Sequence, residues 1–368
     1  MDRRTNVSIM VRKLVWIALG IVITGVLIWG YPKYSLYTKS RKLSSNTEVK
    51  AFYIKLPTQL DELADLLEKS GVINDKDAFI KVGNYKRMSE LNIATGKYMI
   101  QPKTEYRNLL NGFKLNSAGN GNAEVEVEVT FNNCRDLNEL AGKVSNSIYI
   151  DSADLVAFLL DKKTLTKYGF KAEQFPAMFL PNTYRMFYDT DEAEFTERMA
   201  TEFRNFWSDE RKEKLKSIGL KSPSQAVTLA SIVYSEQSRH SDEWPIIAGL
   251  YLNRLKKGIK LQSDPTFKFC WGSELDGVQR LLSVHRNIDC AYNTYKINGL
   301  PPGPICIPPA STVDAVLNRS EVNYIFMCAK PDYSGRHNFA VSDKDHVNNA
   351  KAFQKWLAGE IKNKNNAK

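Results

Sequence analysis

Residues 14–31 form an apolar run without a charged side chain close to the N-terminus. A helix of this length just crosses a hydrocarbon core of about 30 Å. Trp16, Trp29 and Tyr31 lie near its ends, where amphipathic rings favour the membrane interface. No small-x-small cleavage site follows, which disfavours a removable signal peptide, and a buried soluble helix is seldom apolar all round. The run therefore predicts an uncleaved transmembrane anchor over residues 14–32.

Charge around this run does not decide the orientation of the anchor. Basic residues occur on both sides in nearly equal number, so the positive-inside rule gives a near tie. Those before the run are Arg3, Arg4, Arg12 and Lys13, and those after it are Lys33, Lys39, Arg41 and Lys42. The chemistry of the remaining chain must therefore indicate on which side it lies.

The composition is that of an ordinary folded protein. With 43% hydrophobic and 25% charged residues among 368, the chain falls outside the disordered, collagen-like and low-complexity classes. A net charge of +10 favours a polyanionic partner, which could be nucleic acid, anionic lipid or an anionic cell-wall polymer. Because the sequence has neither a localised basic patch nor a recognisable nucleic-acid motif, we do not expect a nucleic-acid partner.

Cysteine and histidine are too sparse and too irregularly spaced to indicate a metal centre. The five cysteines show no CxxC spacing, and the four histidines no HExxH motif. We therefore expect no metal and no cofactor, and we interpret the cysteines as buried thiols or as one incidental disulfide. The cysteines are Cys134, Cys270, Cys290, Cys306 and Cys328.

After a polar stretch interpreted as a tether (33–49), residues 50–117 show a β-α-α-β pattern. Strands are expected at 51–54 and 96–100, and helices at 60–67 and 75–82, the second capped by Asn74. This order resembles a LysM-type glycan-binding module, although any small α+β unit could produce it.

Residues 123–131 alternate between valine or phenylalanine and polar residues, which predicts a half-buried strand. Glu124, Glu126 and Glu128 are expected on its solvent face. The segments 136–144, 153–161 and 192–214 are then expected to be packing helices.

A helix that begins at Ser222 carries the strongest chemical signal. Ser222 is expected at the N-cap with Pro223 in the first turn, and Gln225 is positioned for a capping box. Glu236 follows Leu229 by seven residues, so it should share the helix face of that apolar side chain. Apolar surroundings raise the pKa of a carboxyl group, as a general acid requires. The alternative is that Glu236 only pairs with an arginine or lysine.

The segments after this helix suit a carbohydrate cleft. An amphipathic helix is expected over residues 242–255. Residues 261–266, 291–295 and 299–305 then combine Asn, Gln, Ser, Thr and Tyr with stiffening prolines. Such side chains hydrogen-bond hydroxyls and amides, and aromatic rings offer flat faces to a sugar.

These segments together resemble the endolytic murein transglycosylase (YceG-like) family. The matching stretches, in order, are LASIVYSEQ (229–237), IAGLYLNRLKKGIKLQSDPT (247–266), AYNTYKINGLPPGPI (291–305) and GRHNF (335–339). The resemblance implies an α+β protein with a transmembrane helix, a small LysM-like subdomain and a larger catalytic domain at 118–358, with its core at 222–357. Residues 1–13 would be a cytoplasmic tail and 359–368 a basic tail.

The resemblance also implies site residues. The catalytic glutamate is the second acidic residue of an ASIVExE pattern and falls on Glu236, whereas the first acidic position holds Tyr234 here. Further residues fall on the recurring cleft segments and are expected to bind substrate: Gln262, Asp264, Thr266, Tyr292, Asn293, Tyr295 and His337.

The implied activity is lytic cleavage of peptidoglycan between N-acetylmuramic acid and N-acetylglucosamine, with 1,6-anhydro products. Glu236 would donate the proton and then accept one from the C6 hydroxyl of the muramic acid. The implied location is the cytoplasmic membrane, with a single span and an extracytoplasmic (periplasmic) catalytic domain. Glycan strands would be the substrate, and penicillin-binding-protein synthases are possible partners. The alternative is a non-catalytic, membrane-anchored peptidoglycan-binding protein.

Overall fold

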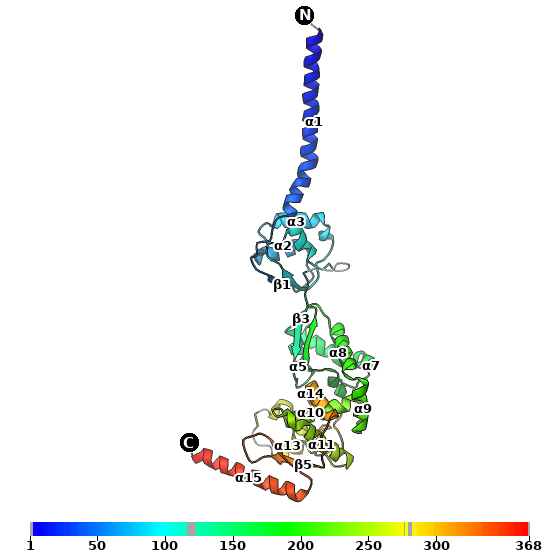
Figure 1. Cartoon of the computed structure of the whole chain (residues 1–368), viewed down its shortest axis with the longest axis vertical. Coiled ribbons are helices and arrows are strands. Elements are labelled where there is room, and N and C mark those ends of the chain that lie inside the picture. The colour runs from blue at the N-terminus through cyan, green and yellow to red at the C-terminus, as the bar shows by residue number, and fades with distance from the viewer. Residues whose placement is uncertain (1–2, 116–122, 276, 279–281, 367–368) are drawn as a thin grey trace. The chain divides into compact units, whose positions relative to one another are not determined.

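The computed structural model describes residues 3–115, 123–275, 277–278 and 282–366. The chain divides into two compact units (Figure 1). The first comprises Met1–Val127 with Met186–Asp189, and the second comprises Glu128–Arg185 with Thr190–Lys368. Helices combine with short two-stranded antiparallel sheets, as the expected α+β class requires.

Helix α1 (Arg3–Ser40) is longer than the expected span of residues 14–32. Its portion Met10–Ser40 has the length and apolarity to cross a membrane, with a mean hydropathy of 2.2 in its most apolar window. Pro32 lies within the helix without ending it. The expected polar tether at 33–49 is therefore helical as far as Ser40.

The rest of that expected tether, residues 41–49, is built into the first unit. Ser44 and Asn46 are buried. The backbone N–H of Ser44 donates to the Thr104 carbonyl at 2.8 Å, and Asn46 Nδ2 donates to the Ile100 carbonyl at 3.2 Å. Since protein groups rather than water satisfy these polar atoms, the segment is not a free linker.

The first unit has the expected β-α-α-β order. Its two strands pair antiparallel, with Lys50 opposite Ile100 and Ile54 opposite Gly96. Leu63, Phe79 and Tyr98 are fully buried in its core. This order alone does not define a glycan-binding surface, so the likeness to LysM stays a prediction. After α1, its elements are β1 (Lys50–Ile54), α2 (Leu60–Lys69), α3 (Lys76–Tyr85), η1 (Met88–Glu90), β2 (Gly96–Ile100) and α4 (Tyr106–Asn111).

Two local expectations in this region are corrected. Helix α3 is capped by Asp75, whose carboxylate accepts from the Ala78 N–H at 2.9 Å, and not by Asn74. Strand β3 covers only Val127–Phe131. Glu124, expected on the solvent face, instead has a side chain that is 9% exposed, with Lys114 Nζ 3.7 Å from its Oε1. Burial raises the pKa of the Glu124 carboxyl.

The second unit is mainly helical. The single helix expected over 192–214 is two helices, because Ser208 accepts from the Arg211 N–H and starts a new one. The expected basic tail from residue 359 is helical as far as Asn366. The elements are β3, α5 (Leu137–Ser145), α6 (Ser152–Leu160), α7 (Lys162–Tyr168), η2 (Ala172–Met178), β4 (Asn182–Met186), α8 (Glu192–Phe206), α9 (Asp209–Ser217), α10 (Pro223–Glu236), η3 (Ser241–Glu243), α11 (Trp244–Lys256), α12 (Asp264–Trp271), η4 (Gly272–Leu275), α13 (Ser283–Arg286), α14 (Ala310–Leu317), β5 (Phe326–Ala329), β6 (His337–Ala340) and α15 (Asp343–Asn366).

Helix α10 is the centre of the second unit and packs against α14, η2 and α11. The sequence predicts an apolar stripe on one face, but every residue from Ala226 to Val233 is buried. Thr228 and Ser231 are compatible with this because their hydroxyls donate to the helix carbonyls of Ser224 and Thr228, each at 2.7 Å. A helix enclosed in this way has a fixed rotation, which in turn orients Glu236 at its end.

Candidate active site

The start of α10 sets the position of Glu236. As predicted, Ser222 accepts from the Gln225 N–H, at 3.3 Å, and Pro223 occupies the first turn. The Gln225 side chain accepts from the Lys221 N–H at 2.7 Å, one residue earlier than in a regular capping box. From this start the helix runs to Glu236, its last residue.

Two hydroxyl groups hold the Glu236 carboxylate. Tyr251 Oη on α11 donates to Glu236 Oε1 at 2.7 Å, and Ser263 Oγ donates to the same oxygen at 2.5 Å. Both donors are buried. Among the described residues, no arginine or lysine pairs with Glu236, and no group hydrogen-bonds to its Oε2. The alternative of a simple ion pair therefore finds no partner in this part of the chain.

The surroundings of Glu236 favour its protonated form. Burial raises the pKa of the carboxyl, and the negative charge of Asp264 adds to this. The hydrogen bonds from Ser263 and Tyr251 and the nearby His337 act in the opposite direction, but the pKa remains above the ordinary value for glutamate. This is the direction that general acid catalysis near neutral pH requires.

Glu236 lines a cavity of about 530 Å³ in the second unit. Four of the predicted substrate-binding residues also line it: Gln262, Asp264, Tyr295 and His337. Tyr295 Oη donates to Asp264 Oδ1 at 2.5 Å, so these two side chains are fixed to one another. The cavity thus combines a carboxylic acid with polar and aromatic groups suited to a sugar. Its remaining lining includes Leu250, Tyr251, Arg254, Leu261, Phe326, Met327, Cys328, Ala329, Asp343 and His346.

Comparison with known proteins gives the family. The YceG-like family matches residues 52–352 of this chain. The chain belongs to the YceG-like family. The endolytic murein transglycosylase of Bacillus subtilis (strain 168) is 25% identical over 359 residues, which is 92% of each chain. That of Streptococcus pneumoniae serotype 2 (strain D39 / NCTC 7466) is 23% identical over 315 residues, or 79% of this chain and 56% of the relative.

A crystal structure of a YceG-like protein from Listeria monocytogenes has the same fold. It superposes with a TM-score of 0.52 at 21% sequence identity, covering 82% of this chain and 99% of the other. The similarity therefore extends over most of the described fold of this YceG-like chain.

Three predicted binding residues of this YceG-like protein do not line the cavity. Thr266 and Asn293 are completely buried. Thr266 Oγ1 donates to the Ser263 carbonyl at 2.6 Å, and Asn293 Nδ2 donates to the Arg286 and Ile288 carbonyls, each at 2.8 Å. These contacts hold the loops that present Ser263 and Tyr295, and the expected substrate contact of Thr266 and Asn293 stays a prediction.

Tyr292 and Tyr234 are packing residues in this YceG-like chain. The ring of Tyr292 lies 4.6 Å from that of Phe269, and Tyr234 lies 6.1 Å from Trp244. Both are partly buried against the core around α10. At the position where the family pattern has its first acidic residue, this chain therefore has an aromatic side chain in an apolar contact and not a second carboxyl group in the cavity.

From the sequence alone, four residues at this site are not distinguished: Tyr251, Ser263, Arg254 and Glu243. Tyr251, Ser263 and Arg254 lie within the family-like stretch 247–266, so their position in that motif was the available signal. Arg254 is 7% exposed and donates to the carbonyls of Lys260 and Ile325 and, at 2.5 Å, to Gln262 Oε1. Gln262 thus lines the cavity, and the buried Arg254 holds its side chain in place.

Among the described residues, no group of His, Cys, Asp or Glu is arranged to hold a metal ion. Of the two interpretations left open for the cysteines, the structure shows one disulfide, between Cys270 and Cys290. Cys134, Cys306 and Cys328 are free thiols. Disulfides persist mainly in oxidising compartments, which is relevant to where the domain acts.

Proposed function

We propose that this YceG-like protein is an endolytic peptidoglycan lytic transglycosylase, a lyase that cleaves between N-acetylmuramic acid and N-acetylglucosamine. The observation that carries this is the Glu236 carboxyl, held by two hydroxyls in a polar cavity where its pKa is raised. The names of the relatives in Bacillus and Streptococcus support the same activity. A purely glycan-binding role would give no reason for such a carboxyl group.

The bond-breaking step uses Glu236 as the acid. Its Oε2, which accepts no hydrogen bond from the described residues, carries the proton and donates it to the glycosidic oxygen as the bond to the muramic C1 breaks. The C6 hydroxyl of the same sugar then attacks C1 and closes the 1,6-anhydro ring. Because this nucleophile is part of the substrate, no second carboxylate is needed to activate water. The developing positive charge is stabilised by the substrate acetamido group or by Asp264.

The proposed location is the outer side of the cytoplasmic membrane. Helix α1 has the length and apolarity of a single span, and the Cys270–Cys290 disulfide is typical of an oxidising compartment. Peptidoglycan also lies outside this membrane. Residues 1–13 would then be cytoplasmic, and the tethered domain would cut nascent strands beside penicillin-binding-protein synthases, ending their elongation.

The test is digestion of purified sacculi by wild type and by Glu236→Gln, followed by mass analysis of the released muropeptides. Wild type should release fragments with 1,6-anhydromuramic acid ends. Gln keeps the shape of the side chain but cannot donate a carboxylic proton, so the variant should release none at a measurable rate. Glu274→Gln is the matched control, because this exposed glutamate of η4 lies outside the cavity lining and should leave the rate unchanged.

Three results would contradict the proposal. Cleavage by Glu236→Gln at the wild-type rate would show that Glu236 is not the acid. Reducing-end muramic acid as the main wild-type product would instead indicate a hydrolase. Strand binding without cleavage by wild type would favour the non-catalytic alternative.

A further inference from the structure

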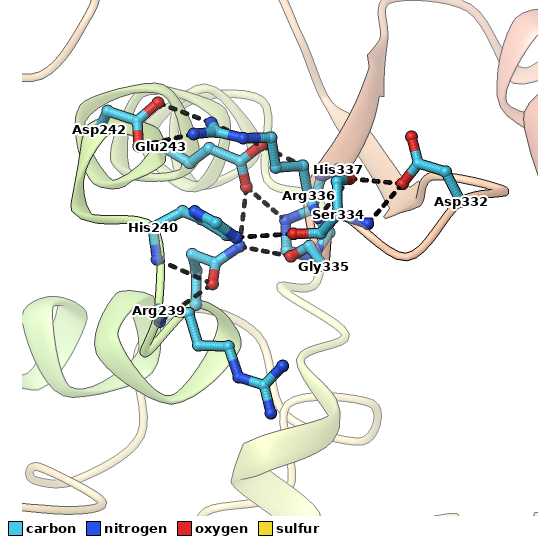
Figure 2. A network of polar contacts seen from close by, with 10 residues as sticks. Arg239, His240, Asp242, Glu243, Asp332, Ser334, Gly335, Arg336 and His337 are labelled. Atoms are coloured by element: carbon cyan, nitrogen blue, oxygen red, sulfur yellow. Dashed lines mark hydrogen bonds and ion pairs between the residues drawn. The ribbon is translucent and has the colours of Figure 1, made fainter.

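His337 is bound at two points by one buried carboxylate (Figure 2). Its backbone N–H donates to Glu243 Oε1 at 3.1 Å, and its ring Nδ1 lies 2.8 Å from Glu243 Oε2. Glu243 is 5% exposed. The two residues are 94 positions apart in sequence, so this contact exists only in the folded chain.

Glu243 is ionised in this setting. Burial acts to raise its pKa, but hydrogen bonds from the His337 ring, Gln237 and the His337 backbone outweigh burial, and the pKa lies below the ordinary value. Gln237 Nε2 donates to Glu243 Oε2 at 3.0 Å and also to the Gly335 carbonyl at 2.9 Å. The carboxylate and the backbone just before His337 are therefore held by the same amide.

An ionised carboxylate at Nδ1 determines which ring nitrogen of His337 carries the proton. Glu243 can only accept, so Nδ1 must be the N–H donor, and the lone pair of the neutral ring is then on Nε2. No described residue hydrogen-bonds to Nε2. Since His337 lines the same cavity as Glu236, this second nitrogen is the one available to a bound substrate.

The loop that carries His337 is also fixed on its other side. His240 Nε2 lies 2.7 Å from the Ser334 carbonyl oxygen, and Arg336 Nη1 donates to Asp242 at 2.6 Å. These contacts join the turn between β5 and β6 to the segment that follows α10 (Figure 2). The acceptor is therefore pre-organised relative to the acid at the end of that helix.

We propose that His337 is the catalytic base of the ring-closing step and that Glu243 is its positioning residue; this rests on the proposed function. The C1–O4 bond breaks first, as O4 takes the proton of Glu236. The C6 oxygen then forms its bond to C1, and its proton moves to His337 Nε2. The imidazolium that forms is stabilised by the Glu243 carboxylate. Proton exchange with water then restores both groups.

In this arrangement one residue acts as the acid and another as the base, whereas the family resemblance implies that Glu236 does both. The acid can remain protonated until bond cleavage, because it does not have to become the base for the hydroxyl. A base aimed at the substrate hydroxyl also favours ring closure over attack by water. The ratio of anhydro to reducing ends is therefore a readout that a merely structural histidine would not change.

The experiment uses the full chain in detergent micelles, with isolated glycan strands as substrate. Loss of a general base typically costs at least about 100-fold in rate. His337→Ala should therefore form anhydro ends about 100-fold more slowly, with a larger share of reducing ends, and free imidazole should restore part of the anhydro rate. His337→Gln, which retains a polar side chain, provides a second variant, and thermal unfolding verifies that both are folded.

Glu243→Gln tests the positioning role. The Gln amide can donate to Nδ1 and so place the proton on Nε2, which removes the acceptor. We expect about a 10-fold loss of anhydro formation and a 15N NMR signal showing a protonated Nε2. Glu213→Gln is the matched control: it makes the same chemical change in the exposed pair with Lys216 on α9, touches neither Glu243 nor His337, and should leave the product ratio unchanged.

The outcomes separate this inference from the proposed function. If wild type cleaves strands but a folded His337→Ala keeps the wild-type anhydro fraction, or loses rate without imidazole rescue, the base assignment is wrong. If Glu243→Gln keeps the wild-type rate and tautomer, the positioning assignment is wrong. If wild type cleaves nothing, the proposed function itself fails.

Discussion

At the scale of single residues, the acidity of Glu236 results from opposing contributions. Burial and the Asp264 charge raise the pKa of its carboxyl, and the hydroxyls of Ser263 and Tyr251 lower it. The hydroxyls stabilise the ionised form because each donates to Oε1. They therefore orient the carboxyl group but also lower its pKa, which reduces the fraction that is protonated near neutral pH.

Removing one of these donors should extend activity to higher pH. In Tyr251→Phe or Ser263→Ala, the ionised carboxylate loses a hydrogen bond, so the pKa of Glu236 should rise further. In the proposed mechanism the protonated form is the active one, so the alkaline limb of the kcat/KM profile should move to higher pH, with less than about a tenfold loss at the plateau. The pH profile of strand cleavage measures this shift. Tyr292→Phe is the control outside the cavity lining, and an alkaline limb that moves to lower pH would contradict the argument.

At the scale of elements, helix α12 and the loop that ends in Tyr295 form one wall of the cavity. Thr266 Oγ1 on α12 lies 2.8 Å from Thr294 Oγ1, and the backbone N–H of Gln262 donates to the Thr294 carbonyl. The Cys270–Cys290 disulfide links the same two segments. The position of this wall therefore depends on the hydrogen bonds and the disulfide between its two segments, and less on the short helix α12 by itself.

Loss of this disulfide should weaken that wall. A bridge with a sequence separation of 20 residues stabilises the folded state by about 3 kcal/mol in the chain-entropy account. The double variant Cys270→Ser/Cys290→Ser should therefore unfold at lower denaturant concentration and lose cleavage activity at a lower temperature. Dithiothreitol should destabilise wild type by a similar amount and leave the double variant unaffected. Equal denaturant midpoints for wild type and the double variant, measured without dithiothreitol, would contradict the prediction.

At the scale of the whole molecule, the groups that hold Glu236 and His337 all belong to the second unit. The first unit contains α1 and the β-α-α-β subdomain, and residues 41–49 contribute buried groups to it. The candidate active site and the apolar helix thus lie in separate parts of the chain, which allows the proposed chemistry and the proposed membrane attachment to be tested separately.

A chain that starts at Lys33 should be soluble and should cleave isolated strands, because it keeps the buried Ser44 and Asn46. A chain that starts at Thr47 loses their hydrogen bonds, each worth about 1 kcal/mol, so its first unit should unfold at lower temperature while cleavage persists. Calorimetry and strand digestion measure both effects. Equal melting of the two forms would contradict the structural role of residues 41–46.

In cells, the Lys33 form exported by a cleavable signal peptide should fail to replace the full chain completely. In the proposed function, tethering raises the local concentration of the protein near membrane-bound synthases. Glycan chain lengths at native expression provide the readout. Normal lengths would mean that the anchor serves only for export.

The sequence by itself determined the local features of this protein. The uncharged run predicted α1, Ser222 and Pro223 predicted the start of α10, and the helical period placed Glu236 on the helix face of Leu229. The family-like motifs marked which segments surround the site. These signals are readable because they depend on neighbours within a turn or two of the chain.

Only the tertiary structure decided which polar side chains of those segments face the cavity. Asp264 and Thr266 lie within one turn of α12, yet the first lines the cavity and the second is completely buried. The Glu243–His337 contact and the Cys270–Cys290 bond join residues with no local pattern between them. Packing of α10, α11 and the β5–β6 hairpin brings such partners together, and local periodicity carries no information about that packing.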